Sequence, residues 1–471
     1  MGSPGVRLRV KKVPQRKKPH FTERNRRISP NGLTSPLGKC YRSIIMGNYK
    51  TRICDSVLAH KLEGVGAVLL EGPKWCGKTT TCERLAKSVL YMGDPETKDS
   101  NLRIADISIK SLLEGERPRL LDEWQLAPKL WDAVRFDVDH SDGFGHFILT
   151  GSVVPPDLDE ISHSGTGRII RLKMRTMSLW ESLESSGGVS LGALMAGDLP
   201  AVVRCEGRSL DEMAYLVCRG GWPQAVGQAG DMALERAEEY YDATVNIDIS
   251  KVDDVPRDPD RVMRLMRSYA RLQATSAKLT AIRQDMFGHD SAGLDEDTVR
   301  SYLGALKKMF VVEDAPAWCP CLRTKAVVRT GDTRYFTDSS IAAAALGAGP
   351  GDLVHDMRTF GLLFETMAMR DLRCYADAMG GKVSHYLDAN GLECDAVIHL
   401  RNGRFGLVEI KLGGNALTEE GAVTLNRLAP LIDEEKTGRL AFKMVVTAVG
   451  EYAYTRKEDG VVVCPISALR P

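Results

Sequence analysis

Residues 72–79 read Gly-Pro-Lys-Trp-Cys-Gly-Lys-Thr, which is the full G-x-x-x-x-G-K-T pattern of a phosphate-binding P-loop. The apolar run 65–70 before the motif predicts a buried strand. After the motif, the apolar spacing from Thr79 to Leu90 predicts a helix. A glycine turn between a strand and a helix is the alternative, but the flanking pattern is the one that the motif requires. The stretch therefore predicts nucleotide binding on an α/β fold.

The residue types of the motif suit a nucleoside triphosphate. Glycines at 72 and 77 let the backbone N–H groups point at phosphate oxygens, and the N-terminus of the next helix adds a positive end. Lys78 is expected to neutralise the β- and γ-phosphates and Thr79 to offer its hydroxyl to Mg²⁺. The predicted nucleotide-binding residues of this stretch are Gly72, Pro73, Lys74, Trp75, Cys76, Gly77, Lys78, Thr79 and Thr80.

A second motif follows at Leu120-Leu121-Asp122-Glu123. Apolar residues that end in Asp-Glu are typical of a Walker B strand. Asp122 would hold Mg²⁺ through water, and Glu123 would act as general base on the attacking water. The apolar run is short, and Asp-Glu pairs also occur on solvated turns, so the position after the P-loop carries this prediction.

Two further polar residues stand beside predicted strands. Thr150 ends the strand 147–149 and could sense the γ-phosphate, or it could simply cap the strand. Arg168 follows a glycine-rich turn and precedes the strand 169–172. It is a candidate arginine finger, in cis or in trans, and a solvated turn residue is an equal alternative.

Together, the P-loop, the Leu-Leu-Asp-Glu-Trp-Gln stretch, Leu-Thr-Gly-Ser at 149–152 and the Gly-Arg before a strand resemble a family of bacterial and archaeal AAA-type ATPases. The resemblance runs from about Met46 to the C-terminus. It implies ATP with Mg²⁺, and a C-terminal region that resembles a winged helix joined to a PD-(D/E)XK nuclease-type fold. The sequence contains no Asn-Lys-x-Asp guanine-reading motif.

The middle of the chain reads as helical. Residues 181–250 predict a helical lid or connector with Trp222 as a packing anchor. Residues 251–345 predict a winged-helix unit with helices near 258–273, 277–286 and 295–309, the last capped by Asp295. A strand at 310–313 and a basic wing from Arg323 to Phe336 would complete it. Such a unit either contacts DNA or packs against the nucleotide domain.

The C-terminal segment 346–471 predicts an αβββαβ order with four functional residues. Glu365 lies on the helix, Asp395 on one strand, and Glu409 and Lys411 on one face of the next strand. This is the Asp…Glu-x-Lys pattern of PD-(D/E)XK nucleases. Asp395 and Glu409 would bind Mg²⁺, and Lys411 would orient or deprotonate water. A solvated charge ladder is the alternative, although charges within a buried strand would be costly without a partner.

Composition and charge limit the class of protein and its location in the cell. The 471 residues, 43% hydrophobic and 27% charged, suit a globular protein of about three domains. No apolar run is long enough for a membrane span, and the eleven scattered cysteines favour a reduced, cytoplasmic protein. Residues 1–45 hold twelve Lys or Arg and one acid, which leaves the remainder at a net charge of −10. This tail is either a nucleic-acid arm or a stretch upstream of a true start at Met46.

The sequence predicts five segments: a tail (1–45), a P-loop ATPase (46–180), a connector (181–250), a winged helix (251–345) and a nuclease-like domain (346–471). Two hypotheses about function follow from this division. The first is a Mg²⁺-dependent ATPase coupled to a C-terminal domain that acts on DNA. The second is a nucleotide-dependent switch whose nuclease fold serves only as a binding surface. The intact acid–acid–Glu-x-Lys set favours the first, and the acidic body favours the second.

Overall fold

The structure is a computed structural model that describes residues 2, 49–153, 165–253, 255–287, 295–320 and 331–471. Residues Lys50–Pro471 form one compact unit. The predicted basic tail and start at Met46 lie outside the described residues, as do Arg323, Lys325 and Arg329 of the predicted wing.

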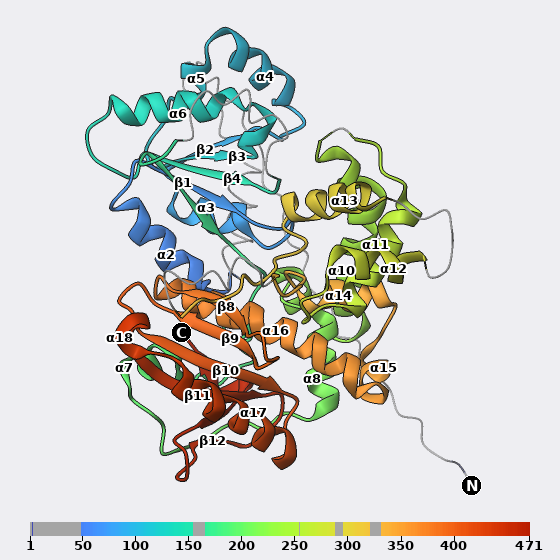
Figure 1. Cartoon of the computed structure of the whole chain (residues 1–471). Coiled ribbons are helices and arrows are strands. Elements are labelled where there is room, and N and C mark those ends of the chain that lie inside the picture. The colour runs from blue at the N-terminus through green and yellow to red at the C-terminus, as the bar shows by residue number, and fades with distance from the viewer. Residues whose placement is uncertain (1, 3–48, 154–164, 254, 288–294, 321–330) are drawn as a thin grey trace. The chain divides into compact units, whose positions relative to one another are not determined.

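A parallel five-stranded sheet carries the P-loop (Figure 1). Its spatial order is β2-β3-β4-β1-β5, and every pairing is parallel. Because all strands run the same way, their carboxyl ends meet at one edge, which is where ligands bind in such sheets. The predicted α/β fold is confirmed for this region, and its sheet is parallel throughout. The strands are β1 (Ala67–Glu71), β2 (Ser88–Tyr91), β3 (Arg119–Asp122), β4 (Phe147–Gly151) and β5 (Ile169–Lys173).

Helices cover both faces of this sheet, because its apolar strands alternate between two cores. Val68, Leu70 and Ile148 face one cluster with α2 and α3. Leu69 and Leu149 face a second cluster with α4, α5 and α6. The flanking helices are α2 (Ile53–Leu62), α3 (Lys78–Leu85), α4 (Lys98–Ile107), α5 (Ile109–Leu113) and α6 (Lys129–Asp139).

The helix after the P-loop is shorter than predicted. It was expected to reach Leu90, but α3 ends at Leu85, and Ser88–Tyr91 forms strand β2. The backbone of β2 pairs in parallel with β3, from Ser88 opposite Arg119 to Tyr91 opposite Asp122. The apolar pair Val89 and Leu90 fits either element by periodicity alone, and pairing with the neighbouring strand decides between them.

A seven-stranded mixed sheet forms the C-terminal part of the chain, in the order β7-β12-β13-β11-β10-β9-β8. The predicted αβββαβ order is present, since strands β8 to β10 are antiparallel neighbours and β11 pairs in parallel with β10. The helix that follows β10 is interrupted near Pro430, so α17 ends at Leu428 and a short α18 (Glu434–Thr437) follows. The other elements are α16 (Met357–Ala378), β8 (Lys382–Leu387), β9 (Glu393–His399), β10 (Phe405–Lys411), α17 (Asn415–Leu428), β11 (Leu440–Thr447), β12 (Tyr452–Thr455) and β13 (Val462–Pro465).

The connector 181–250 is not wholly helical, contrary to the prediction. Strand β7 (Val202–Arg204) extends the C-terminal sheet by pairing with β12. Strand β6 (Val189–Ser190) pairs in parallel with β14 (Leu469–Arg470). Such short strands carry little sequence signal, and their partners lie about 250 residues or more further along the chain. The connector is therefore built into the C-terminal sheet.

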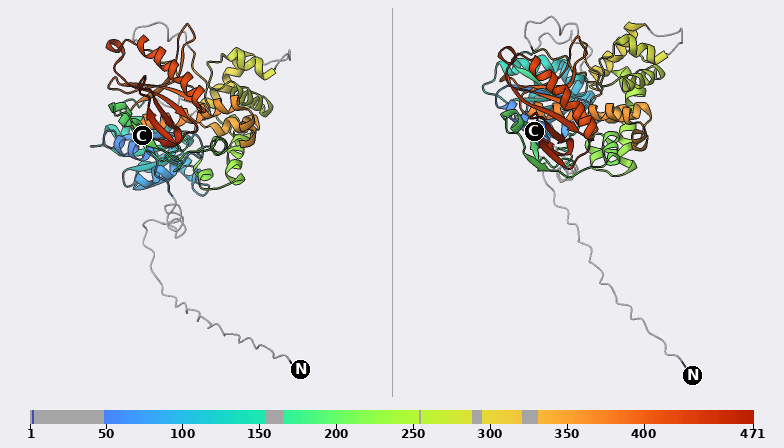
Figure 2. Two further views of the ribbon diagram at one scale, coloured as in Figure 1. Left: turned by 90° about the horizontal axis from the view of Figure 1, so that it is seen from below. Right: turned by 60° about the horizontal axis from the view of Figure 1, so that its bottom comes forward.

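A group of helices joins the two sheets, and α11 to α13 lie together in every view (Figures 1 and 2). The three helices of the predicted winged helix are present, and Asp295 caps α13 by accepting from Thr298 N. The strand predicted at 310–313 is wrong. Among the described residues, this segment forms isolated bridges instead, between Val312 and Phe336, Ala315 and Thr333, and Ala317 and His385. The helices are α8 (Leu210–Arg219), α9 (Pro223–Val226), α10 (Asp231–Ala243), α11 (Pro259–Arg271), α12 (Leu279–Phe287), α13 (Glu296–Lys308), α14 (Ser339–Leu346) and α15 (Pro350–His355).

Among the helices in the described part of the chain, none has both the length and the apolar character needed to cross a bilayer.

Candidate functional site

The P-loop connects β1 to α3 and its backbone requires glycine at two positions. A Cβ on Gly72 would lie 2.1 Å from the carbonyl oxygen of Met174, so any side chain there would clash with backbone. Gly77 has φ +99° at the start of α3, a conformation that other residues avoid. The loop is thus packed against the segment that follows β5.

Lys78 lies in the mouth of this loop and is almost fully buried. Its ammonium donates to the carbonyl oxygens of Gly72 at 3.0 Å and Pro73 at 2.8 Å. These contacts hold the charge over the loop, which is the position that the motif assigns to the phosphate-binding lysine.

Asp122 brings three of the predicted residues together at the carboxyl edge of the sheet. Its Oδ1 accepts hydrogen bonds from the hydroxyls of Thr79 at 2.7 Å and Thr150 at 2.6 Å. Strands β3 and β4 are direct neighbours, which explains why Asp122 and Thr150 meet. A buried carboxylate and a P-loop threonine hydroxyl are the protein ligands expected for Mg²⁺ in P-loop enzymes.

Glu123 lies beside this cluster in a left-handed backbone conformation, with φ +56°. Its backbone N–H donates to Thr150 Oγ1 at 3.2 Å, and its carboxylate accepts from Ser152 Oγ at 3.3 Å and from the amide of Gln125. Non-glycine residues in this conformation are uncommon and concentrate at functional sites. The roles of Gln125 and Ser152 in orienting the carboxylate were missed from the sequence, although both stand within the quoted motifs.

Aromatic residues from two distant segments lie beside the loop. Trp75, at its apex, is 46% exposed and meets Tyr240 of α10 edge-on with ring centroids 5.7 Å apart. Tyr240 in turn stacks on Trp222 at 4.3 Å. Trp222 is buried and its indole N–H donates to Ser340 Oγ, as expected of a packing anchor. Lys74 also forms an ion pair with Asp248 at 2.6 Å.

Arg52, just before α2, donates a hydrogen bond to the P-loop backbone and was not predicted from the sequence. Its buried guanidinium donates to the carbonyl oxygen of Cys76 at 2.8 Å and to that of Arg175 at 2.8 Å. It also pairs with Glu181 at 2.9 Å. Burial disfavours both charges, yet the attraction of Arg52 and hydrogen bonds from Ser178 and Ile53 keep the pKa of Glu181 below its usual value. No local pattern signals this residue, because its partners lie 24 to 129 residues away.

Arg168 is not brought to the nucleotide site. It precedes β5, and its carbonyl oxygen accepts from Ala67 N at the amino end of β1, whereas the P-loop follows the carboxyl end of that strand. Its half-exposed side chain pairs with Asp139 at 2.6 Å. Four residues of extended strand separate the two edges, on the order of 13 Å. Within one chain, this geometry does not supply an arginine finger.

The four C-terminal residues predicted from the sequence do lie together. The Lys411 ammonium is 2.9 Å from Glu409 Oε2 and 3.9 Å from Asp395 Oδ2. Asp395 also accepts from the backbone N–H of Ile410 at 2.7 Å. Glu365 extends from α16, and its charge acts on the same cluster.

Burial and mutual repulsion dominate the electrostatics of this acidic cluster. Burial, reinforced by Asp395, raises the pKa of Glu409 to about 8. The pKa of Glu365 is raised well above its usual value, first by burial and then by Asp395. The phenol of Tyr335 donates a hydrogen bond to Glu365 Oε1 at 2.5 Å. Burial and the charge of Asp395 also raise the pKa of Glu393. Neither Tyr335 nor Glu393 was predicted as part of the cluster.

The fit of a divalent cation to this cluster is limited to two carboxylates. Within the described residues, no three His, Cys, Asp or Glu side chains are grouped so that they could hold a metal ion. Asp395 and Glu409 converge on the Lys411 ammonium. Mg²⁺ is commonly bound through one or two carboxylates plus water and phosphate, so the oxygen donors suit it when a phosphodiester is also present.

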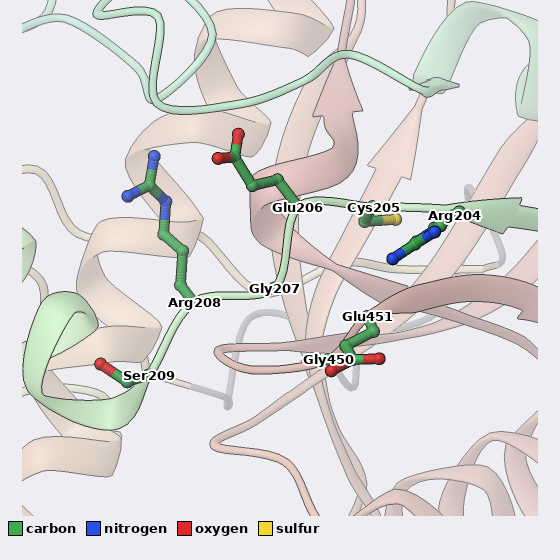
Figure 3. Close-up of a pocket in the computed structure, with 8 residues that line it drawn as sticks. All are labelled: Arg204, Cys205, Glu206, Gly207, Arg208, Ser209, Gly450 and Glu451. Atoms are coloured by element: carbon green, nitrogen blue, oxygen red, sulfur yellow. The ribbon is translucent and has the colours of Figure 1, made fainter.

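A separate cavity of about 700 Å³ lies beside β7 and shares no residue with either cluster (Figure 3). Arg204, Arg208, Glu206 and Glu451 contribute charges of both signs to its lining. Arg208 is already paired with Glu184 at 2.7 Å. With two basic and two acidic side chains and the buried thiol of Cys205, the lining points to no single class of ligand.

Comparisons with known proteins support the nucleotide site. Residues 65–183 match a family described as "AAA domain". Residues 210–352 and 360–469 match two families described only as domains of unknown function, DUF8612 and DUF4143. No curated protein matches the chain.

Among solved structures, the Walker-type ATPase PABY2304 of Pyrococcus abyssi is similar to 62% of this chain over 94% of its own. The identity is 14% and the TM-score is 0.36. The family match, together with the complete P-loop and the parallel sheet, identifies residues 65–183 as a P-loop ATPase domain of the AAA type.

Proposed function

We propose that the chain is a Mg²⁺-dependent ATPase. The observation that carries the proposal is the meeting of the Thr79 and Thr150 hydroxyls on Asp122 beside the P-loop. Lys78 neutralises the β- and γ-phosphates, and Thr79 and Asp122 hold the cation. Glu123 accepts a proton from the attacking water, and Thr150 relays the state of the γ-phosphate to Glu123 through its hydrogen bond to that backbone N–H. Bound Mg²⁺ supplies charge neutralisation of the phosphates.

Steady-state ATP hydrolysis tests this proposal. Wild type is expected to hydrolyse ATP with Mg²⁺ and not in EDTA, and Lys78→Ala is expected to abolish nucleotide binding. Lys443→Ala serves as a matched lysine control, because that ammonium, on β11 of the C-terminal sheet, donates to Asn426 Oδ1 and to the backbone carbonyl oxygen of Asp459. Hydrolysis that survives EDTA or Lys78→Ala would refute the proposed site.

We also propose that the C-terminal cluster is the active site of a nuclease-like domain acting on DNA. The observed αβββαβ order and the convergence of Glu365, Asp395, Glu409 and Lys411 support this reading. Asp395 and Glu409 would hold Mg²⁺, and Lys411 would orient the attacking water. The domain boundaries 181–250, 251–345 and 346–471 and the winged-helix assignment of α11 to α13 belong to the same proposal.

One observation favours the alternative of a nucleotide-dependent switch. Lys411 is within ion-pair distance of both carboxylates, which leaves its ammonium less available for water. Cleavage of single- and double-stranded DNA in Mg²⁺, with and without ATP, separates the two readings. Loss of cleavage in Lys411→Ala but not in Lys443→Ala supports the nuclease. Binding of ATP without any cleavage by wild type supports the switch.

The cellular setting is part of the proposal. The nine cysteines of the described residues are all free thiols, and eight of them are buried. Buried, unpaired thiols suit a reducing compartment, so we propose a cytoplasmic location. Thiol titration of the protein purified without reductant checks this, because a disulfide among these nine would contradict it.

A further inference from the structure

A cavity of about 940 Å³ lies between the AAA-type domain and the C-terminal sheet. One wall is formed by α2 and the outer strand β5. The other wall is formed by β8, the turn between β9 and β10, and α18. Both β5 and β8 are the last strands of their sheets, so the cavity runs along two sheet margins.

Positive charge dominates the lining of this cavity. Seven basic side chains and a single carboxylate, Asp377, line it. Three of the basic residues, Lys61, Lys382 and Arg401, have no acidic partner within the described part of the chain. Asp377 is already paired with Arg175 at 2.5 Å. Three positive charges therefore remain uncompensated.

The other basic side chains of the lining are held in place by carboxylates that lie outside it. Arg171 pairs with Glu71 at 3.1 Å, and Lys173 and Arg175 share Glu313 at 3.2 and 2.7 Å. Lys436 pairs with Asp433. These pairs fix the walls, whereas Lys61, Lys382 and Arg401 are available to a ligand. They come from α2, β8 and the β9–β10 turn, and so from both walls.

Apolar side chains line the same cavity between the charges. Val57, Ile170, Leu172 and Leu400 contribute aliphatic surface, and the edge of the largely buried Trp318 lies beside His399. A ligand that combines anionic groups with flat apolar groups matches this lining. Unpaired nucleotides have this character, since their phosphates require cations and their base faces require apolar contact. A paired duplex would hide its base faces from these side chains.

We propose that this cavity binds single-stranded nucleic acid, with phosphates contacting Lys61, Lys382 and Arg401. The inference rests on the proposed function in naming nucleic acid as the partner, and it adds the surface and the strandedness. The surrounding body is acidic, at −10 outside residues 1–45, so such binding requires a local positive surface of this kind. Binding of single-stranded nucleic acid in this cavity requires neither ATP hydrolysis nor cleavage.

Fluorescence anisotropy with a labelled 20-nucleotide poly-dT tests the proposal on the full chain. The measurement is made in EDTA without nucleotide, so failure of either proposed enzymatic activity leaves it readable. The test variant combines Lys61→Ala, Lys382→Ala and Arg401→Ala. The matched control combines Arg204→Ala, Arg427→Ala and Lys457→Ala, three exposed basic residues outside this cavity. The basic segment 1–45 is present in every variant.

Loss of three phosphate contacts is expected to lower the slope of log affinity against log salt by about 2, and the affinity at 0.1 M salt by about 100-fold. The control triple is expected to remain within about threefold of wild type. A charge-preserving triple, Lys61→Arg, Lys382→Arg and Arg401→Lys, should retain binding, which distinguishes lost charge from misfolding. Equal affinities of the test triple and wild type would overturn the proposal. Equal losses in both alanine triples, or tighter binding of a matched duplex than of poly-dT, would also overturn it.

Discussion

Replacing Arg52 with methionine should destabilise the AAA-type domain by about 4 kcal/mol. The Arg52 and Glu181 side chains are only 4% and 3% exposed. Removing one member of such a buried pair leaves a charge without its partner, which costs about 3–5 kcal/mol. Glu181 would keep three hydrogen-bond donors, from Ser178 N, Ser178 Oγ and Ile53 N. The cost of leaving its carboxylate without Arg52 should therefore lie near the low end of that range.

The carbonyl oxygens of Cys76 and Arg175 would also lose their donor, at roughly 0.5–1.5 kcal/mol each. Since Cys76 belongs to the P-loop, we expect ATP affinity to fall as well, by about tenfold for a loss of 1.4 kcal/mol. Urea unfolding followed by tryptophan fluorescence measures the first effect, and titration with a fluorescent ATP analogue in EDTA measures the second.

Two matched variants make the test of Arg52 strict. Arg168→Met removes another arginine from an ion pair in the same domain, but that pair with Asp139 lies at the surface, so the urea midpoint should stay close to that of wild type. Combining Arg52→Met with Glu181→Gln should recover part of the loss, because the stranded charge is removed. A cost below 1 kcal/mol for Arg52→Met, or a double variant that is merely additive, would refute the reasoning.

Three other results are expected. Glu123→Gln should reduce ATP hydrolysis by about 100- to 10,000-fold while leaving ATP affinity unchanged, because the residue acts on the attacking water; a parallel loss of affinity would contradict that role. Arg168→Ala should leave hydrolysis in dilute protein unchanged, because Arg168 lies at the edge of the sheet opposite the P-loop. A fall that appears only at high protein concentration would show that Arg168 acts on a neighbouring copy. Tyr335→Phe should cost about 1–2 kcal/mol in urea unfolding, since it removes the donor to the buried Glu365; an unchanged midpoint would show that this hydrogen bond contributes nothing.

The sequence was most informative where function depends on strand ends in one parallel sheet. Asp122 and Thr150 lie at the carboxyl ends of their strands, and Thr79 follows the P-loop that leaves the end of β1. A parallel sheet brings the carboxyl ends of its strands to one edge, so the three residues meet there. The same rule could have placed Arg168 correctly, since a residue that precedes a parallel strand lies at the opposite edge. Arg52 and Tyr335 escaped prediction because their partners are distant in sequence and no short pattern encodes those contacts.

For the C-terminal cluster, the sequence identified Glu365, Asp395, Glu409 and Lys411, but it did not identify Tyr335 or Glu393 or the electrostatics. Alternation along β10 placed Glu409 and Lys411 on one face, as observed. The raised pKa of Glu409 depends on burial and on Asp395 from the neighbouring strand, and neither magnitude can be read from a linear pattern. The short strands β6 and β7 were missed because two or three residues carry no periodic signal.

The pairing of β7 with β12 also has a consequence for synthesis on the ribosome. Arg204 lies opposite Tyr452 in the finished sheet, so the first strand emerges roughly 250 residues before its partner. At a translation rate of about 5–20 residues per second, β7 remains without its partner strand for about 10 to 50 s. Val202 is 66% exposed even in the finished sheet, and the waiting edge offers unpaired N–H and C=O groups to any other chain. The nascent protein therefore cannot complete its C-terminal sheet until synthesis has passed β13, which ends at Pro465.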